Sequence, residues 1–174
     1  MLNERVLNIL QESFFKILIP GITYTIPLTL VSFAFGLLIA IVAALIQVSN
    51  VRILTPIIRF YVWVIRGTPL LVQLFIIFYG LPNAGIVLKA LPAAIIAFSL
   101  NVGAYASETL RASILSVPLG QIEAGYSLGM NYFQVLRRII LPQAFKVSVP
   151  PLFNSFISLV KDTSLAANIT VTEM

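Results

Sequence analysis

Long apolar stretches, separated by short polar ones, recur along almost the whole chain. No residue between positions 17 and 51 is charged, and three further apolar stretches follow. A helix that crosses a bilayer needs about 20 consecutive apolar residues. The pattern therefore predicts four membrane-spanning helices, at residues 25–47, 57–81, 91–116 and 146–168.

The first residues of the chain follow a different pattern. Between residues 3 and 18, apolar side chains recur at helical spacing and charged side chains fall on the opposite side. A helix of this kind lies on the membrane surface. Pro20 and Gly21 are expected to end it. We therefore predict a single transmembrane domain over residues 1–174, with a surface helix ahead of the four spans.

The composition agrees with a membrane location and excludes several functions. Hydrophobic residues make up 59% of the chain and charged residues 10%, against about 25% charged residues in soluble domains. Histidine and cysteine are both absent, which removes the commonest general base and metal ligand. The net charge of +5 is scattered between apolar stretches, as in membrane topology rather than nucleic-acid binding. We expect no catalytic site, no metal site and no nucleic-acid partner.

Lysine and arginine residues also predict the orientation. Four spans place both termini on one side of the membrane. With this topology, seven basic residues fall on the side of the loop at residues 118–142 and three fall on the side of the termini. The positive-inside rule assigns the richer side to the cytoplasm, which puts the N-terminus outside. The seven are Arg52, Arg59, Arg66, Arg111, Arg137, Arg138 and Lys146, and the three are Arg5, Lys16 and Lys89.

The loop at residues 118–142 is amphipathic rather than simply apolar. Proline suits the first turn of a helix, so Pro118 is expected to begin one. Glu123 would then lie early in this helix, where the helix dipole favours a negative charge. A second short helix is expected to end at Pro142. The predicted unit is a helix–turn–helix on the cytoplasmic membrane surface.

Three small residues in this loop, Ala124, Gly125 and Gly129, would let another surface approach closely. Glycine at position 129 also suits the left-handed conformation that ends a helix. From the residues alone, the loop is either a partner-binding unit or a connector that lies on lipid headgroups.

The spacing within the loop resembles the cytoplasmic coupling motif of ABC importer permeases. The family pattern is Glu-Ala-Ala, three residues, Gly, nine residues, then Ile-x-Leu-Pro, and the single departure here is Gly125 for the second alanine. The resemblance implies that the loop docks on a separate ATPase. The coupling residues it implies are Glu123, Ala124, Gly125, Gly129, Ile139, Leu141 and Pro142.

Other stretches resemble the permeases of polar amino acid importers, such as the glutamine, arginine, histidine and cystine systems. The resemblance implies an all-α membrane protein with the type I ABC importer (MetI-like) helical bundle. Such permeases have a fifth transmembrane helix beyond the position of Met174, so the sequence is expected to lack that last helix. The stretches are residues 66–73, 104–108, 116–118 and 161–165.

The resemblance further implies a function, partners and a location. The chain has no Gly-x4-Gly-Lys-Ser/Thr loop, so ATP and Mg²⁺ are expected in a partner ATPase, with no cofactor in this chain. The implied function is ATP-driven import of a polar amino acid across the bacterial cytoplasmic membrane. Four spans cannot enclose a path, so a second permease copy or a sister permease is expected. An extracytoplasmic substrate-binding protein and membrane lipid are the other expected partners.

Polar side chains at membrane depth are functional candidates by default. Asn101 and Glu108 share one face of the third predicted span. Glu108 either faces a substrate path or pairs locally with Arg111. Arg66, at a predicted helix end, is expected to reach the cytoplasmic interface, whereas Gln73 lies deeper and has no charge to anchor.

On the fourth predicted span, Ser158 and Asp162 align with Ser155 on one face. They either line a polar path or form hydrogen bonds between helices. The predicted substrate path thus comprises Asn101, Glu108, Ser158, Asp162 and Gln73.

Two other classes of function also fit so hydrophobic a chain. An intramembrane hydrolase needs a nucleophile and a base, and without histidine or cysteine only a Ser–Lys arrangement around Lys161 is conceivable. A secondary transporter usually shows repeated halves and more helices. Peptide hydrolysis by the purified chain would support the first, and uptake without ATP would support the second.

Overall fold

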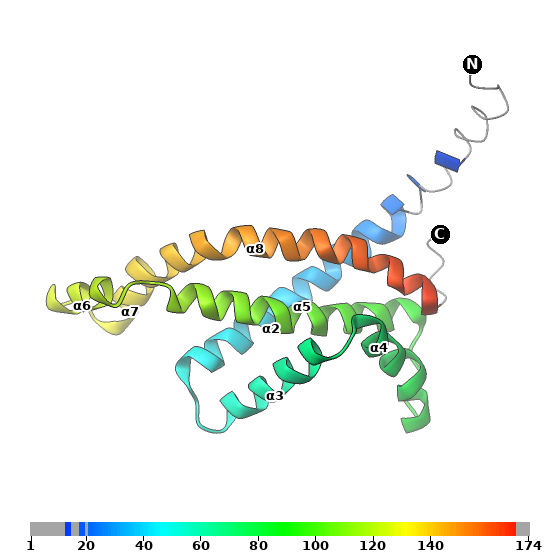
Figure 1. Cartoon of the computed structure of the whole chain (residues 1–174), viewed down its shortest axis with the longest axis horizontal. Coiled ribbons are helices and arrows are strands. Elements are labelled where there is room, and N and C mark those ends of the chain that lie inside the picture. The colour runs from blue at the N-terminus through cyan, green and yellow to red at the C-terminus, as the bar shows by residue number, and fades with distance from the viewer. Residues whose placement is uncertain (1–12, 15–17, 20, 170–174) are drawn as a thin grey trace, which may run out of the picture.

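The computed structural model describes residues 13–14, 18–19 and 21–169, and within these ranges all regular structure is helical. Three long helices, α2 (Ile26–Ser49), α5 (Ala90–Leu115) and α8 (Leu141–Asp162), form the body of the bundle (Figure 1). The short helices α6 (Leu119–Ser127) and α7 (Tyr132–Val135) lie together at one end of the bundle. The remaining helices are α3 (Leu54–Gly67) and α4 (Leu70–Phe75).

Shorter helical turns extend several of these helices. They are the π-helical turns Gly21–Thr25, Ile76–Gly80 and Leu136–Ile140, and the 3₁₀ turns Leu81–Ala84 and Thr163–Ile169.

Small residues let α2 and α5 pack closely at the centre of the bundle. A Cβ atom on Gly36 of α2 would lie 2.6 Å from Val102, and one on Gly103 of α5 would lie 2.7 Å from Ile39. Close approach of this kind gains van der Waals contact between helices in a membrane. Fully buried Phe98 anchors the apolar core that α5 shares with its neighbours.

Length and composition set the number of helices that can cross a membrane. Gly21–Ser49 and Ala90–Leu115 are each long and apolar enough to cross a membrane. The bent pair α3–α4 gives a third crossing if the two helices form one broken span. Within the described part of the chain, α8 is not apolar enough to count as a further membrane-spanning helix, because polar residues and two internal prolines interrupt its apolar face. The predicted surface helix at residues 3–18 falls outside the described residues, apart from positions 13–14 and 18.

The prediction of one kinked helix over residues 57–81 is wrong. The segments Leu54–Gly67 and Leu70–Ala84 meet at 108°. A residue before proline is pushed out of the helical region, and Thr68 is accordingly extended, with φ −119° and ψ 141°. Pro69 also has no N–H to continue the ladder. The chain therefore makes a full break where the sequence pattern predicted a kink.

The fourth helix also differs from its predicted limits. Pro142, expected to end the second loop helix, instead lies at the start of α8, directly after the π-helical turn Leu136–Ile140. Helical backbone runs from α7 through the π-helical turn Leu136–Ile140 into α8 without a break. At the other end α8 stops at Asp162, and Thr163–Ile169 continues as a 3₁₀ turn that buries Ile169.

Candidate functional site

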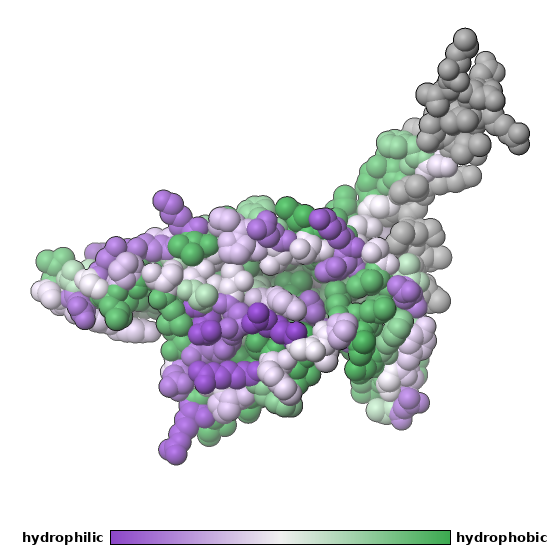
Figure 2. Space-filling view, in the orientation of Figure 1, coloured by the Kyte–Doolittle hydropathy of each residue, from purple (hydrophilic) through white to green (hydrophobic). Residues whose placement is uncertain are grey.

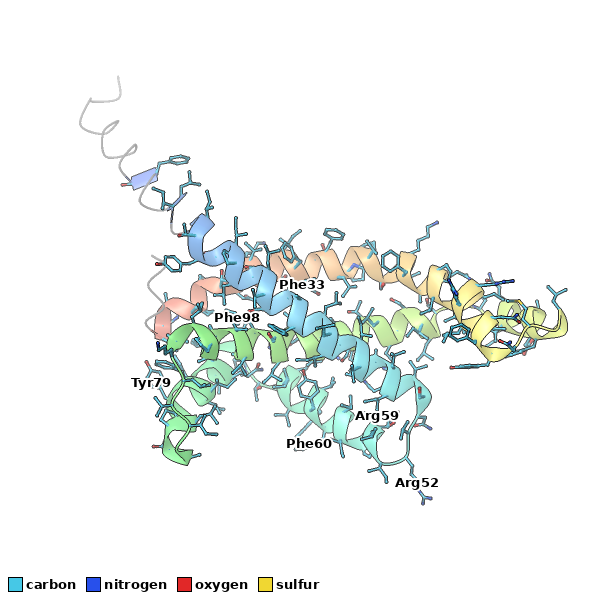
Figure 3. All side chains as sticks on the ribbon, turned by 180° about the vertical axis from the view of Figure 1, so that it is seen from behind. Phe33, Arg52, Arg59, Phe60, Tyr79 and Phe98 are labelled. Carbon is cyan, nitrogen blue, oxygen red and sulfur yellow. The ribbon has the colours of Figure 1, made fainter. Side chains whose placement is uncertain are left out.

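Polar side chains gather on one face of the bundle, around α3, α5 and α8 (Figure 2). From behind, α2 crosses in front of the bundle (Figure 3), and its exposed large side chains are apolar. Charged groups cost several kcal/mol in a hydrocarbon environment. The polar face is therefore the side that requires water or another protein chain, and two clefts lie on it.

The first of these, the central cleft, encloses about 360 Å³ between the α3–α4 bend, the middle of α5 and the last turns of α8. Asn101, Ser158 and Asp162, three of the five predicted path residues, lie together in its wall. Among the residues that the structure describes, none forms an ion pair with Asp162. The lining residues are Thr68, Pro69, Leu70, Asn101, Val102, Tyr105, Ser155, Ser158, Leu159 and Asp162.

Gln73 is buried beside the central cleft and braces the α3–α4 bend. Its Nε2 donates to the carbonyls of Ile65 at 2.7 Å and Thr68 at 2.9 Å. The Ile65 carbonyl is the acceptor that an N–H at position 69 would have used, so the amide of Gln73 replaces the donor that Pro69 lacks. Its Oε1 accepts a hydrogen bond from Asn101 Nδ2 at 3.1 Å. The bend and the α5 wall of the cleft are thereby linked.

We expect Gln73→Leu to lower the thermal stability of the purified permease, because the partly buried Thr68 carbonyl loses its donor and the Asn101 amide loses its acceptor, at about 1–3 kcal/mol for each unsatisfied group. Gln47→Leu is the matched control, since Gln47 is equally buried but its Nε2 donates to no backbone carbonyl among the described residues. Melting in detergent measures both variants. An unchanged melting temperature in Gln73→Leu, or an equal loss in the two variants, would contradict the bracing role.

Glu108 lies apart from the central cleft. Its Oε2 is 2.8 Å from Arg111 Nη2, so the local pair that the sequence left open is formed. The same side chain lines a second cleft of about 470 Å³, here called the arginine cleft. Its lining residues are Gln47, Arg59, Val62, Trp63, Arg66, Gly67, Tyr105 and Glu108.

Arg66, expected to reach the cytoplasmic interface, lies at the end of α3 beside α5. Its Cζ lies 5.2 Å from the ring centroid of Tyr105, a cation–π distance. From Tyr105, α5 continues to Leu115, about 15 Å further along the axis. The guanidinium is therefore held beside α5 about 15 Å before the C-terminal end of that helix.

Gly129 shapes the turn between the two loop helices. Its φ of +79° lies in the left-handed region, as the sequence suggested. The Gly129 N–H donates to Tyr126 O at 2.9 Å and the Met130 N–H donates to Gly125 O at 3.1 Å, which is the Schellman pattern. After the turn, Asn131 and Gln134 form a reciprocal capping box at the start of α7. The loop has a defined geometry that depends on a glycine at position 129.

Gly125 gives a physical reason for the long spacing of the loop pattern. A Cβ atom there would lie 2.7 Å from Ile139 Cδ1 and 3.2 Å from Val135 Cγ2. The close approach expected at Gly125 is therefore made by this chain itself, between α6 and the helix that leads into α8. Gln143 Nε2 adds a second link through Gln121 Oε1. The two loop helices and the start of α8 form one packed unit.

The rest of the loop presents an exposed surface. Glu123 and Ala124 are exposed on α6, although Glu123 lies beyond the first turn, where the dipole has little effect. Leu141 and Pro142 are exposed at the start of α8. Large exposed apolar side chains surround them, and an exposed apolar patch of this kind is typical of a protein interface. They are Leu119, Tyr126, Leu128, Tyr132 and Phe133.

The structure adds residues to the site that sequence reasoning did not select. Thr68 lines the central cleft, and Tyr105 lines both clefts. Tyr105 shares a helix face with Asn101 and Glu108, so the helical period already pointed to it. Thr68 had no comparable pattern, because its position depends on the break before Pro69.

This fold combines apolar helices long enough to span a membrane with a polar face and an exposed helical loop at one end, as a membrane permease subunit requires. The family of binding-protein-dependent transport system inner membrane components matches residues 36–174, and the chain belongs to that family. It is an inner-membrane, multi-pass protein. A permease of this class works with an ATPase subunit and a binding protein, and ATP hydrolysis lies in the ATPase subunit.

Known proteins of similar sequence are amino acid permeases. The L-cystine transport system permease protein TcyB of Bacillus subtilis is 60% identical over 167 residues, which cover 96% of this chain and 71% of TcyB. The probable amino-acid ABC transporter permease protein YckA of the same organism is 44% identical over 160 residues, covering 92% and 71%.

Solved structures agree with the fold. An amino acid ABC transporter crystallised with histidines has a TM-score of 0.86 at 36% identity, over 92% of this chain and 75% of that chain. The MetNI methionine transporter in an inward-facing conformation has a TM-score of 0.73 at 22% identity, over 91% and 76%. The predicted all-α MetI-like bundle is confirmed.

Proposed function

We propose that this permease carries an amino acid through the central cleft and that L-cystine is its cargo. The single observation that carries the amino acid assignment is the Asp162 carboxylate, which lies in a polar cleft beside Asn101 and Ser158 with no ion-pair partner among the described residues. Cystine as the particular cargo is supported by the 60% identity to the cystine permease TcyB.

The central cleft offers a partner for each end of an amino acid. The carboxylate of Asp162 suits an ammonium group, since a charge-assisted hydrogen bond is stronger than a neutral one. The amide of Asn101 and the hydroxyls of Ser158 and Thr68 suit a carboxylate or a polar side chain. Gln73 acts behind this wall by holding Asn101 and the bend in place.

The loop at residues 118–142 is proposed to dock on the ATPase, with its exposed residues Glu123 and Ala124 at the contact. Arg52 lies in the half of the molecule nearer the loop, and Tyr79 lies at the opposite end (Figure 3). Arg137 and Arg138 belong to the loop end itself. By the positive-inside rule we assign this end to the cytoplasm and the N-terminus to the outside.

A second permease chain is proposed to cover the polar face. In a single chain, both clefts open beside lipid, where ionisable groups are unfavourable. A copy or a sister permease placed on this face would enclose the clefts in a shared path, as closed two-fold assemblies do. The extracytoplasmic binding protein would deliver cargo at the end opposite the loop.

The proposal is tested by purifying the permease with its cognate ATPase and binding protein and reconstituting the complex in proteoliposomes. We expect L-cystine, presented by the binding protein, to stimulate ATP hydrolysis and to be transported, whereas L-alanine does neither. Transport that persists without ATP, or hydrolysis that no amino acid stimulates, would overturn the proposed function.

A further inference from the structure

Two arginines on α3 face the polar side of the bundle, and neither forms a direct ion pair among the described residues, although Arg66 lies close enough to Glu108 to act on its charge. Arg59 and Arg66 are seven residues apart and therefore lie on the same side of the helix, roughly 10 Å apart along its axis. Within the described part of the chain, the one ion pair found joins Glu108 to Arg111 and involves neither of them. An unpaired arginine at membrane depth is costly and marks a path for ions or substrates.

The arginine cleft has the chemistry of an anion site. The lining carries two arginines, Arg59 and Arg66, against the one carboxylate of Glu108, which also pairs with Arg111 outside the cleft, so positive charge is in excess. Gln47 adds a buried amide that lies beside the Glu108 carboxylate. Guanidinium groups match the planar geometry of a carboxylate, and the cleft of about 470 Å³ is large enough for a small molecule.

Tyr105 connects this cleft to the central cleft, because its side chain lines both. Arg66 stacks on the ring at 5.2 Å, so the pair stands at the division between the two spaces. The central cleft reaches Asp162 near the end of α8, whereas the arginine cleft reaches Gln47 near the end of α2. Cargo that leaves the central cleft toward the loop end meets Arg66 first.

We propose that the arginine cleft is a second binding site, which holds the carboxylate of the amino acid cargo on the ATPase side of Tyr105. The inference rests on the proposed function, since it takes an amino acid as cargo. Arg66 supplies the first contact and Arg59 the second, while Gln47 offers an amide donor. Cargo that accumulates on the ATPase side occupies this site and slows further transport.

The test uses proteoliposomes that contain the complete transporter. The ATPases face the medium, and the binding protein and labelled L-cystine are enclosed in the vesicles. Unlabelled L-cystine is added to the medium, and the initial rate of transport is measured against its concentration. We expect inhibition in the unaltered protein. Arg66→Gln and Arg59→Gln should each raise the half-inhibitory concentration by roughly tenfold, as expected for one lost charge-assisted hydrogen bond.

Two controls make the result specific. Arg52→Gln removes an exposed arginine that does not line the cleft, and its half-inhibitory concentration should be unchanged. L-cystine dimethyl ester, which has no free carboxylate, should not inhibit. Equal inhibition of the unaltered and Arg66→Gln proteins, no inhibition at all, or inhibition by the ester would overturn the inference.

Failure of the second site and failure of the proposed function give different results in this assay. If the unaltered protein does not transport enclosed L-cystine, the proposed function itself has failed. If transport is normal but the arginine variants are inhibited like the unaltered protein, only the second site has failed. Repeating the titration in vesicles without anionic lipid should give the same values; an arginine effect that needs anionic lipid would assign the cleft to a lipid headgroup and overturn the inference.

Discussion

Uptake of L-cystine by an Asp162→Asn transporter is expected to fall by roughly 10- to 100-fold. The substitution keeps the shape of the side chain but removes the charge that would meet the ammonium group of the cargo, and a hydrogen bond to a charged group is worth about 1.5–3 kcal/mol. Initial uptake rates at low cargo concentration measure the loss.

Lys161→Gln is the matched control for this change. Lys161 is the next residue along α8, is exposed, and does not line the central cleft. Its uptake should stay close to that of the unaltered protein, and both variants should co-purify with the ATPase. Normal uptake by Asp162→Asn would show that Asp162 does not contact the cargo. Asp162 would then be a residue that only packs helices.

Gly129→Val is expected to abolish uptake. A β-branched side chain is strongly disfavoured at the φ of +79° that Gly129 adopts, so the turn between α6 and α7 should lose its Schellman geometry. The docking surface would then be rearranged while the membrane helices remain folded. Uptake by proteoliposomes and recovery of the ATPase on co-purification measure the two consequences.

Gly120→Ala, in the first turn of α6, provides the comparison for this substitution. A Cβ atom there meets nothing within 4 Å and the backbone φ is not positive, so uptake should be retained. Glu123→Lys tests the surface rather than the turn, and we expect it to weaken ATPase binding with the loop intact. Gly129→Val protein that takes up cargo normally would show that the coupling role is assigned to the wrong segment.

The general architecture could be predicted from sequence because it depends on long-range regularities. Apolar stretches place α2 and α5 to within one or two residues of their observed limits, since a spanning helix must be long and apolar. Asn101, Ser158 and Asp162 could likewise be selected, because each lies on a helix whose period fixes its face. The loop pattern led to the family independently of any geometry.

The features that could not be predicted from sequence depend on single side chains that hydrogen-bond to backbone groups where a helix breaks. Pro69 suggested a kink, but the 108° break exists because Gln73 can satisfy the carbonyls that the break frees. The position of Arg66 follows from that break and could not be found without it. Similarly, Pro142 suggests a helix boundary in sequence, whereas helical backbone runs from the π-helical turn through Pro142 into α8.

Helical backbone is continuous from Tyr132 to Asp162, through the π-helical turn Leu136–Ile140 and past Pro150 and Pro151, so a movement of the loop would reach Asp162 through one helical segment. At 1.5 Å per residue it is about 45 Å long, so each degree of tilt at the loop end moves the far end by roughly 0.8 Å. Asp162 is the last residue of that segment. A small rotation of the docked loop would therefore displace the carboxylate by several ångströms relative to Asn101 on α5. The central cleft could thus change the distance between Asp162 and Asn101, and release or bind cargo, without any helix having to unfold.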